Sequence, residues 1–252
     1  MLALGTAFSY SFQLCEQENF SYKLIKIKKL FNVWSQRDLS LYGKITIAKT
    51  LGLTKLIQST SACLHNPPYV MYAVNKLVAE FVWNGKNPKI KRDTLIGPKE
   101  KGELDLPEYE IITKSLLSTW VVRMKDGVNE DWIKIPFFYL EKVGGVLIFD
   151  CNYDLKLLEL NNMPVFYTDI LKTWAEIQGL ESNLQDRHNI GEVIIWNNKN
   201  ITIAGKSLYW RDWHAAGILR IKDLLDESDN FLSYDKLRRK TGLNTPFTNF
   251  GG

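Results

Sequence analysis

Residues 20–34 of the chain read Phe20-Ser21-Tyr22-Lys23-Leu24-Ile25-Lys26-Ile27-Lys28-Lys29-Leu30-Phe31-Asn32-Val33-Trp34. Phe20, Leu24, Ile27, Phe31 and Trp34 recur at spacings of three and four, which predicts an amphipathic helix with one buried stripe. Lysines fill its other faces. Asn19 or Ser21 is expected to cap its start. A helix that lies on a membrane surface has a similar pattern, so that interpretation stays open.

Further helices are expected downstream, and they continue the pattern of a globular bundle. One covers about 40–60, with an apolar set that includes Leu41, Ile45 and Leu56. The next begins at Pro68, which suits a first helical turn, and closes at Trp83-Asn84-Gly85, where glycine accepts the left-handed conformation. A basic loop then precedes a fourth helix, which starts after Pro107 and runs to about Met124.

The two ends of the chain show other patterns. Residues 1–19 alternate aromatic and small polar residues, which predicts a strand or hairpin. Because an isolated strand pair is marginal in water, this end suggests a piece of a larger protein. Beyond residue 126, Pro136, Gly144 and Gly145 interrupt short apolar runs. There we expect helices at about 151–160, 164–178, 207–227 and 233–240, and a hairpin over 194–206 with an Asn-rich turn.

These elements predict a mainly α (α+β) fold in three parts: a hairpin at 1–19, a basic helical domain at 20–125, and a linker with a C-terminal helix and hairpin region at 126–252. The charge changes along the same lines. Residues 20–101 hold 15 Lys and Arg against 4 Asp and Glu, whereas residues 102–252 hold 17 against 22. Such a basic block suits a phosphate-binding surface, although a solvated lysine-rich face has the same composition.

Several classes of protein and site are not indicated. No apolar run reaches the roughly 18 residues that cross a bilayer, and no signal peptide is recognisable, so we expect an intracellular protein. Cys15, Cys63 and Cys151 are too scattered for a disulfide framework or a metal site. We expect no metal and no cofactor. No Tyr-x-Asp-Asp, Walker loop, Gly-x-Ser-x-Gly or His-Glu-x-x-His occurs.

Four segments carry a resemblance to a known family. They are Leu4-Gly5 with Phe8-Ser9, the run Trp34–Thr50, Phe81–Lys86 with Lys89–Arg92, and a C-terminal set from Trp196-Asn197-Asn198 to Phe231–Tyr234. In this order they resemble the region after the polymerase core in reverse transcriptases of non-LTR (LINE-type) retrotransposons. Paired glycines usual in that family are replaced by Lys101-Gly102-Glu103, and the fingers, palm and endonuclease have no counterpart.

The resemblance implies that residues 20–83 form a helical thumb that contacts the template–primer duplex. Its partners would be RNA or an RNA–DNA hybrid, bound through the backbone, and the palm of the polymerase. The implied contacts are Arg37, Lys44 and Lys49, then Lys89, Lys91 and Arg92, while Leu4-Gly5 resembles the primer-grip turn. Without clustered aspartates for paired metal ions, the chain is not expected to polymerise by itself.

Other interpretations of these residues remain open. Trp34, Trp83 and Trp120 suit base stacking, but their apolar stripes favour core packing. The run Lys236-Leu237-Arg238-Arg239-Lys240 suits RNA contact or an ordinary basic helix end. The whole chain also fits a standalone nucleic-acid-binding protein derived from such an element, a decayed retroelement reading frame, or a helical protein-interaction module.

Overall fold

The computed structural model describes residues 2–3, 5–61, 66–101, 103–106, 108–127, 130–158, 160–182 and 190–242. It is mainly α-helical with short β-hairpins, as the sequence predicts. The chain divides into two compact units, Met1–Leu117 and Ser118–Gly252. The division falls within one long helix, α7 (Tyr109–Asp126), slightly before the expected boundary near residue 126. None of the described helices combines the length and apolarity that crossing a membrane requires.

The first unit opens with a small hairpin of β1 (Leu2–Ala3) and β2 (Thr6–Ala7), which pair antiparallel. The predicted strand stops there, because Ser11 caps a helix by accepting a hydrogen bond from the Leu14 amide. Helix α1 (Phe12–Glu16), the π-helical segment η1 (Gln17–Ser21) and α2 (Tyr22–Ser35) follow without a break. The predicted start at Asn19 or Ser21 is therefore wrong. The side chain of Asn19 instead forms hydrogen bonds with the backbone of Ala7 in the hairpin.

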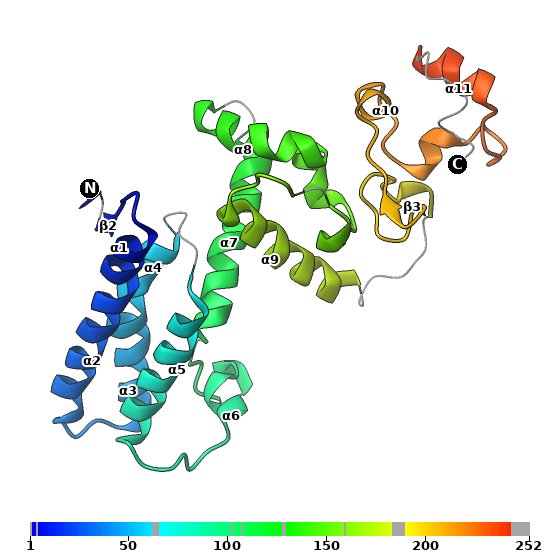
Figure 1. Cartoon of the computed structure of the whole chain (residues 1–252). Helices are drawn as coiled ribbons and strands as arrows, with labels where there is room; N and C mark the ends of the chain where they lie inside the picture. The colour runs from blue at the N-terminus through cyan, green and yellow to red at the C-terminus, as the bar shows by residue number, and fades with distance from the viewer. Residues whose placement is uncertain are drawn as a thin grey trace. The chain divides into compact units, whose positions relative to one another are not determined.

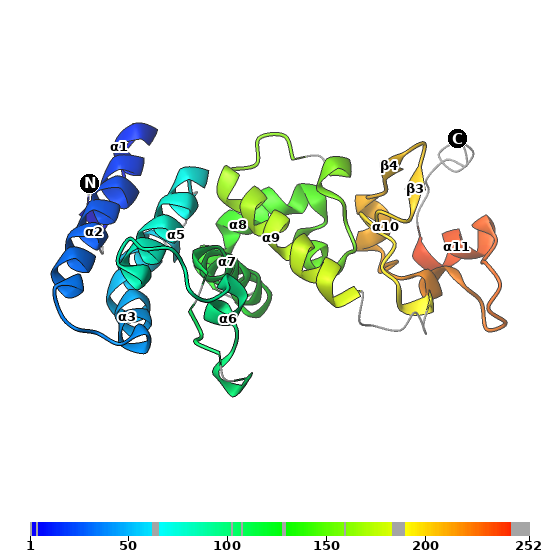
Figure 2. The same ribbon diagram turned by 90° about the horizontal axis from the view of Figure 1, so that it is seen from below.

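The predicted helix over 40–60 is confirmed, with Ser40 as its side-chain cap. It consists of α3 (Leu41–Ile47), the π-helical segment η2 (Ala48–Leu53) and α4 (Thr54–Ser61). Helix α5 (Pro68–Trp83) begins at the predicted proline and ends at Asn84 and Gly85, both of which adopt positive φ. Helices α2, α3 and α5 run alongside one another (Figure 1 and Figure 2).

A single apolar core joins these helices. It contains Phe20, Ile27 and Phe31 from the first helical run, Leu53 and Leu56 from the second, and the stripe Val70, Val74, Val78, Phe81 and Val82 from α5. The expected loop between α5 and α7 contains the short helix α6 (Arg92–Ile96) and the 3-10 segment Lys99–Lys101. Leu95 and Tyr109 attach this connection to the core.

The second unit departs more often from expectation. Helix α8 (Lys134–Leu140) occurs where only punctuated runs were predicted, and Pro136 fits within its first turn. Three 3-10 segments flank it along the chain: Asp131–Ile133, Glu141–Val143 and Gly145–Asp150. The helix expected at 151–160 is wrong for the described residues, which hold only the 3-10 segment Leu155–Leu157. The Tyr153 hydroxyl instead donates to the Leu171 carbonyl, which holds this stretch against α9.

The remaining elements of this unit are partly as predicted. Helix α9 (Val165–Ser182) and helix α11 (Tyr234–Thr241) confirm two predictions. The hairpin of β3 (Thr202–Ile203) and β4 (Lys206–Ser207) exists, but it turns at Ala204-Gly205 and not at the asparagines. The helix expected over 207–227 is interrupted at Gly217, which has a φ of +84°. It is replaced by α10 (Arg211–Ala215) and the 3-10 segment Ile221–Leu224, and another 3-10 segment covers Ile190–Glu192.

Candidate nucleic-acid interface

Basic side chains surround the helices of the first unit. Helix α2 buries Ile27 and Phe31 against the core, whereas Lys26, Lys28 and Lys29 on its other faces are exposed. Within the described part of the chain, a set of exposed lysines in this unit has no carboxylate partner. This set, the exposed lysine set, consists of Lys26, Lys28, Lys29, Lys55, Lys76, Lys86, Lys89 and Lys91. Its charges are thus available to a polyanion.

Lys23 differs from its neighbours on α2. Its ammonium donates to the Gly5 carbonyl at 3.3 Å and to Ser59 Oγ at 2.5 Å. Burial lowers the pKa of Lys23, and the positive charge of Lys26 lowers it further. Lys23 therefore joins the hairpin to α4 and is not part of the open cationic surface.

Arg37 lies in solvent just beyond the end of α2. Its guanidinium carbon lies 4.8 Å from the centre of the Trp34 ring, which is a cation–π contact. Trp34 itself packs partly against the core. The ring therefore holds the guanidinium close to the surface, and no described residue occupies its hydrogen-bond donors, which can meet a phosphate.

Lys44 lies inside the unit rather than on its surface. Only 7% of the residue is exposed, and its ammonium donates to Asn84 Oδ1 at 2.7 Å and to the Val82 carbonyl at 3.4 Å. Asn84 has a φ of +50° at the end of α5. This contact ties α3 to the end of α5, so the position of Lys44 suits a structural role.

Lys49 is exposed and forms an ion pair of 2.7 Å with Asp105. Both side chains are more than a third exposed, so solvent screens the pair and its contribution to stability is small, at about 0–1 kcal/mol. A phosphate oxygen is therefore able to compete with Asp105 for this ammonium.

Lys89 and Lys91 stand in the exposed segment between Gly85 and α6. Arg92 is the first residue of α6, and its side chain lies outside what the structure describes. The structure thus places Lys89 and Lys91 in solvent, near the C-terminal end of α5, as the loop prediction requires.

Gly5, one of the two residues predicted to form a primer-grip turn, lies between β1 and β2. Leu4 lies outside the described residues, and Gly5 has a φ of +74°. The hairpin is held to α2's helical run by Asn19, whose amide donates to the Ala7 carbonyl at 2.7 Å and accepts from the Ala7 amide at 2.8 Å. Gly5 is therefore positioned by a buried polar contact.

The remaining candidates from the sequence lie in different environments. Trp120 makes edge-on contacts with Trp132 and Phe166, so it packs within an aromatic cluster of the second unit. In the basic run of α11, Leu237 is buried and the four basic residues are exposed, with Lys240 donating to the Asp223 carbonyl at 3.0 Å. Among the described residues, no group of three His, Cys, Asp or Glu side chains gathers in a way that would hold a metal ion.

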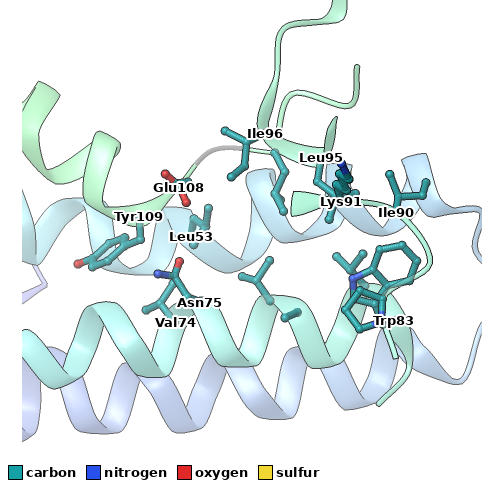
Figure 3. Close-up of a pocket in the computed structure, with 15 residues that line it drawn as sticks. Leu53, Val74, Asn75, Trp83, Ile90, Lys91, Leu95, Ile96, Glu108 and Tyr109 are labelled. Carbon is teal, nitrogen blue, oxygen red and sulfur yellow. The ribbon is translucent and has the colours of Figure 1, made fainter. Parts of the chain in front are cut away.

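The sequence did not predict a pocket beside α5. It has a volume of about 320 Å³ and lies between α5, α6 and the start of α7 (Figure 3). Its walls are mainly apolar, and Trp83 and Lys91 of the predicted sites line it. Asn75 also lines it, and the only sequence signal for that residue is a polar side chain beside the buried stripe of α5.

No known protein-family model matches the chain.

Proposed function

We propose that the first unit is a thumb-like domain that binds the sugar–phosphate backbone of RNA or an RNA–DNA hybrid, as in reverse transcriptases of the non-LTR type. The observation that supports this most strongly is the exposed lysine set, which has no carboxylate partners among the described residues. Neutralising phosphates and releasing their counterions is the main source of such affinity. The proposed contacts carry little sequence information, because they reach phosphates and sugars.

In this proposal the candidate residues have different roles. Arg37, Lys49, Lys89 and Lys91 contact phosphates, and Arg92 is retained with them on sequence grounds. Lys44 supports the interface by fixing Asn84 at the end of α5. Gly5 and the hairpin shape one end of the unit. The proposed role is binding and not chemistry, since the chain has no Tyr-x-Asp-Asp.

The test is the affinity of the purified chain for a labelled RNA–DNA hybrid across a salt series. Each phosphate contact that is lost should reduce the slope of log K against log salt by about 0.7–0.9. Replacing Lys89 and Lys91 together by Glu should therefore weaken binding and flatten this slope by about two contacts. Arg37→Glu with Lys49→Glu should act in the same way.

A matched control is Lys142→Glu with Lys172→Glu, which makes the same change in net charge at exposed positions of the second unit that belong to no candidate site. It should leave the affinity and the slope nearly unchanged. Lys44→Glu is expected to lower the midpoint of urea unfolding as well, because it puts a carboxylate against Asn84 Oδ1 and the Val82 carbonyl. Salt-independent weak binding, or equal losses in the Lys142 and Lys172 control, would contradict the proposal.

A second candidate, a helical protein-interaction module, is favoured by exposed aromatic side chains from the end of β2 to the start of α1. Phe8, Tyr10 and Phe12 are 41%, 111% and 62% exposed. If the hybrid is not bound, this candidate predicts concentration-dependent self-association in sedimentation equilibrium. Phe8→Ser with Phe12→Ser should then abolish that association. A chain that stays monomeric at all concentrations would argue against a module that pairs with itself.

A further inference from the structure

The pocket beside α5 has two chemically different ends. Asn75 and Glu108 lie at one end, and Trp83 and Lys91 lie at the other (Figure 3). Asn75 and Trp83 are eight residues apart on α5, which corresponds to about 12 Å along a helix. Apolar side chains, including Val78, Val82 and Leu95, line the pocket as well. The pocket is therefore elongated, with polar groups toward its ends.

The side-chain amide of Asn75 is a polar group that lines a mainly apolar pocket. The residue is half-buried, and no hydrogen bond holds its side chain within the described part of the chain. In Figure 3 its amide points away from α5 and toward Glu108. A carboxamide offers one acceptor and two donors, so it can form a paired hydrogen bond with a ligand edge that has both functions.

The charges indicate which way a ligand would lie. Lys91 lines one end of the pocket, and Lys89 is exposed close to it in the sequence. The Glu108 carboxylate at the other end repels an anion. A ligand with a phosphate is therefore favoured with that group at Lys91 and its uncharged part toward Asn75.

We infer that this pocket takes one unpaired adenine nucleotide of a bound single strand. An asparagine amide pairs with adenine by accepting from N6 and donating to N7. The apolar walls and the Trp83 ring would cover the faces of the base, as aromatic side chains do in single-strand recognition. Lys91 would meet the phosphate of the same nucleotide. This inference rests on the proposed function, because it adds a base contact to the same nucleic-acid surface.

The pocket has the Asn75 amide at one end, apolar walls in the middle and Lys91 at the other end. This arrangement favours a nucleotide over an apolar protein side chain as the ligand. An apolar side chain would fill the middle of the pocket but would leave the Asn75 amide without a partner, which is costly once water is excluded. It would also gain nothing from Lys91. An adenine nucleotide satisfies both ends.

The test compares two labelled single-stranded RNA oligomers of equal length and equal charge. One carries adenine at every position and the other is abasic. Anisotropy titrations should show that the adenine oligomer binds more tightly to the wild-type chain. Asn75→Leu should lower the affinity for the adenine oligomer by about tenfold, since a bidentate base contact is lost. It should leave the affinity for the abasic oligomer unchanged.

Ala79→Phe supplies an independent variant, because Ala79 lines the pocket but is exposed on α5, so a larger side chain there blocks the pocket without disturbing the core. It should reproduce the effect of Asn75→Leu. Tyr72→Leu is the matched control on the same helix, at a residue that is 72% exposed and does not line the pocket. Urea unfolding of every variant shows whether a loss of binding reflects loss of folding.

Equal affinities for the adenine and abasic oligomers would overturn the inference and leave the backbone proposal standing. So would an unchanged ratio of these affinities in Asn75→Leu. If neither oligomer nor hybrid binds, the backbone proposal fails, and the pocket is then tested with adenosine monophosphate. Shifts of the Asn75 side-chain amide signals in NMR would support the pocket, and unmoved signals would overturn it.

Discussion

At the scale of single residues, Gly52 shows how closely the core of the first unit is packed. The ring of Phe31 stacks on Phe81 with ring centres 4.4 Å apart, and the same ring lies close to the helix at Gly52. A Cβ atom at Gly52 would lie 2.6 Å from Phe31 Cζ. Glycine is therefore required here by the approach of an aromatic ring and not by an unusual backbone conformation.

Gly52→Ala should lower the free energy of unfolding by about 1–2 kcal/mol, because overpacking outweighs the helix propensity of alanine. The midpoint of urea unfolding measures this. Gly43→Ala is the control in the same helical run, where the nearest atom to a new Cβ is Ser40 Oγ at 3.4 Å. It should be neutral or stabilising by up to about 1 kcal/mol. A loss of stability in Gly43→Ala but not in Gly52→Ala would contradict this packing argument.

The hydroxyl of Tyr109 is buried, and this makes the stability of the chain depend on pH at high pH. Its oxygen lies 2.7 Å from Thr60 Oγ1, and it donates to Asn66 Oδ1 at 3.1 Å. Burial raises the pKa of Tyr109 to about 12 from a usual value of 10, although hydrogen bonds from Thr60 and Thr113 act in the opposite direction. The folded chain thus keeps this proton at pH values where the unfolded chain releases it.

The contribution of Tyr109 to stability should therefore be fully present below about pH 10 and decline as the pH rises toward about 12. The slope for one proton is at most about 1.4 kcal/mol per pH unit. The free energy of unfolding, measured with urea between about pH 9 and about pH 11, should decline less steeply with pH for Tyr109→Phe than for the wild type. Tyr72→Phe, at an exposed position, should keep the wild-type slope. An unchanged slope in Tyr109→Phe would contradict the prediction.

At the scale of elements, the N-terminal hairpin depends on a helix for its stability. Two strands of two residues each cannot hold themselves in water. The amide of Asn19, which is 1% exposed, donates to and accepts from the backbone of Ala7. The π-helical segment that contains Asn19 thereby supplies the partner that the small hairpin lacks.

Asn19→Ala should release the hairpin, because both polar groups of Ala7 lose their partner, at about 1 kcal/mol for each bond. Hydrogen exchange at the Ala7 amide should accelerate by about tenfold or more. Asn32→Ala, an exposed position on α2, is the control and should leave this amide protected. If exchange at Ala7 stayed slow in Asn19→Ala, other contacts would have to hold the hairpin.

At the scale of the whole molecule, each of the two units has its own core. The first is the helical core around Phe31 and Val74. The second contains Ile195, Trp196, Trp213, Ile218 and Leu237, and the indole nitrogen of Trp196 donates to the Ile218 carbonyl at 2.6 Å. Separate cores imply that local damage in one unit need not open the other.

Ile218→Ala should therefore destabilise the second unit by about 2–5 kcal/mol, the usual cost of a cavity at a buried isoleucine. Hydrogen exchange should become faster in α10 and α11 while α2 and α5 keep their protection. Val193→Ala, at a position that is 37% exposed, is the control for a small surface loss. Equal acceleration in both units would contradict independent cores.

The sequence predicted the helices of the first unit because their signals are local. The stripe from Phe20 to Trp34, the apolar set of residues 40–60 and the proline at position 68 each act within one or two helical turns. Prediction was poorer in the second unit because its structure depends on contacts between residues that are far apart in the sequence. Asn197 was expected in the turn of the hairpin, but the hairpin turns at Ala204-Gly205, and Asn197 is buried and donates to the Val143 carbonyl at 2.7 Å, a contact across 54 positions. Such contacts leave no periodic pattern.

The sequence by itself determined the fold class, the helical core and the concentration of positive charge in residues 20–101, because composition and periodicity carry those properties. Only the tertiary structure decided which cations are available. It buried Lys44 against Asn84, tied Lys23 to the hairpin and left Lys89 and Lys91 in solvent. It also formed the pocket between Asn75 and Lys91. Both results depend on which distant segments pack together, and packing is a property of the folded chain.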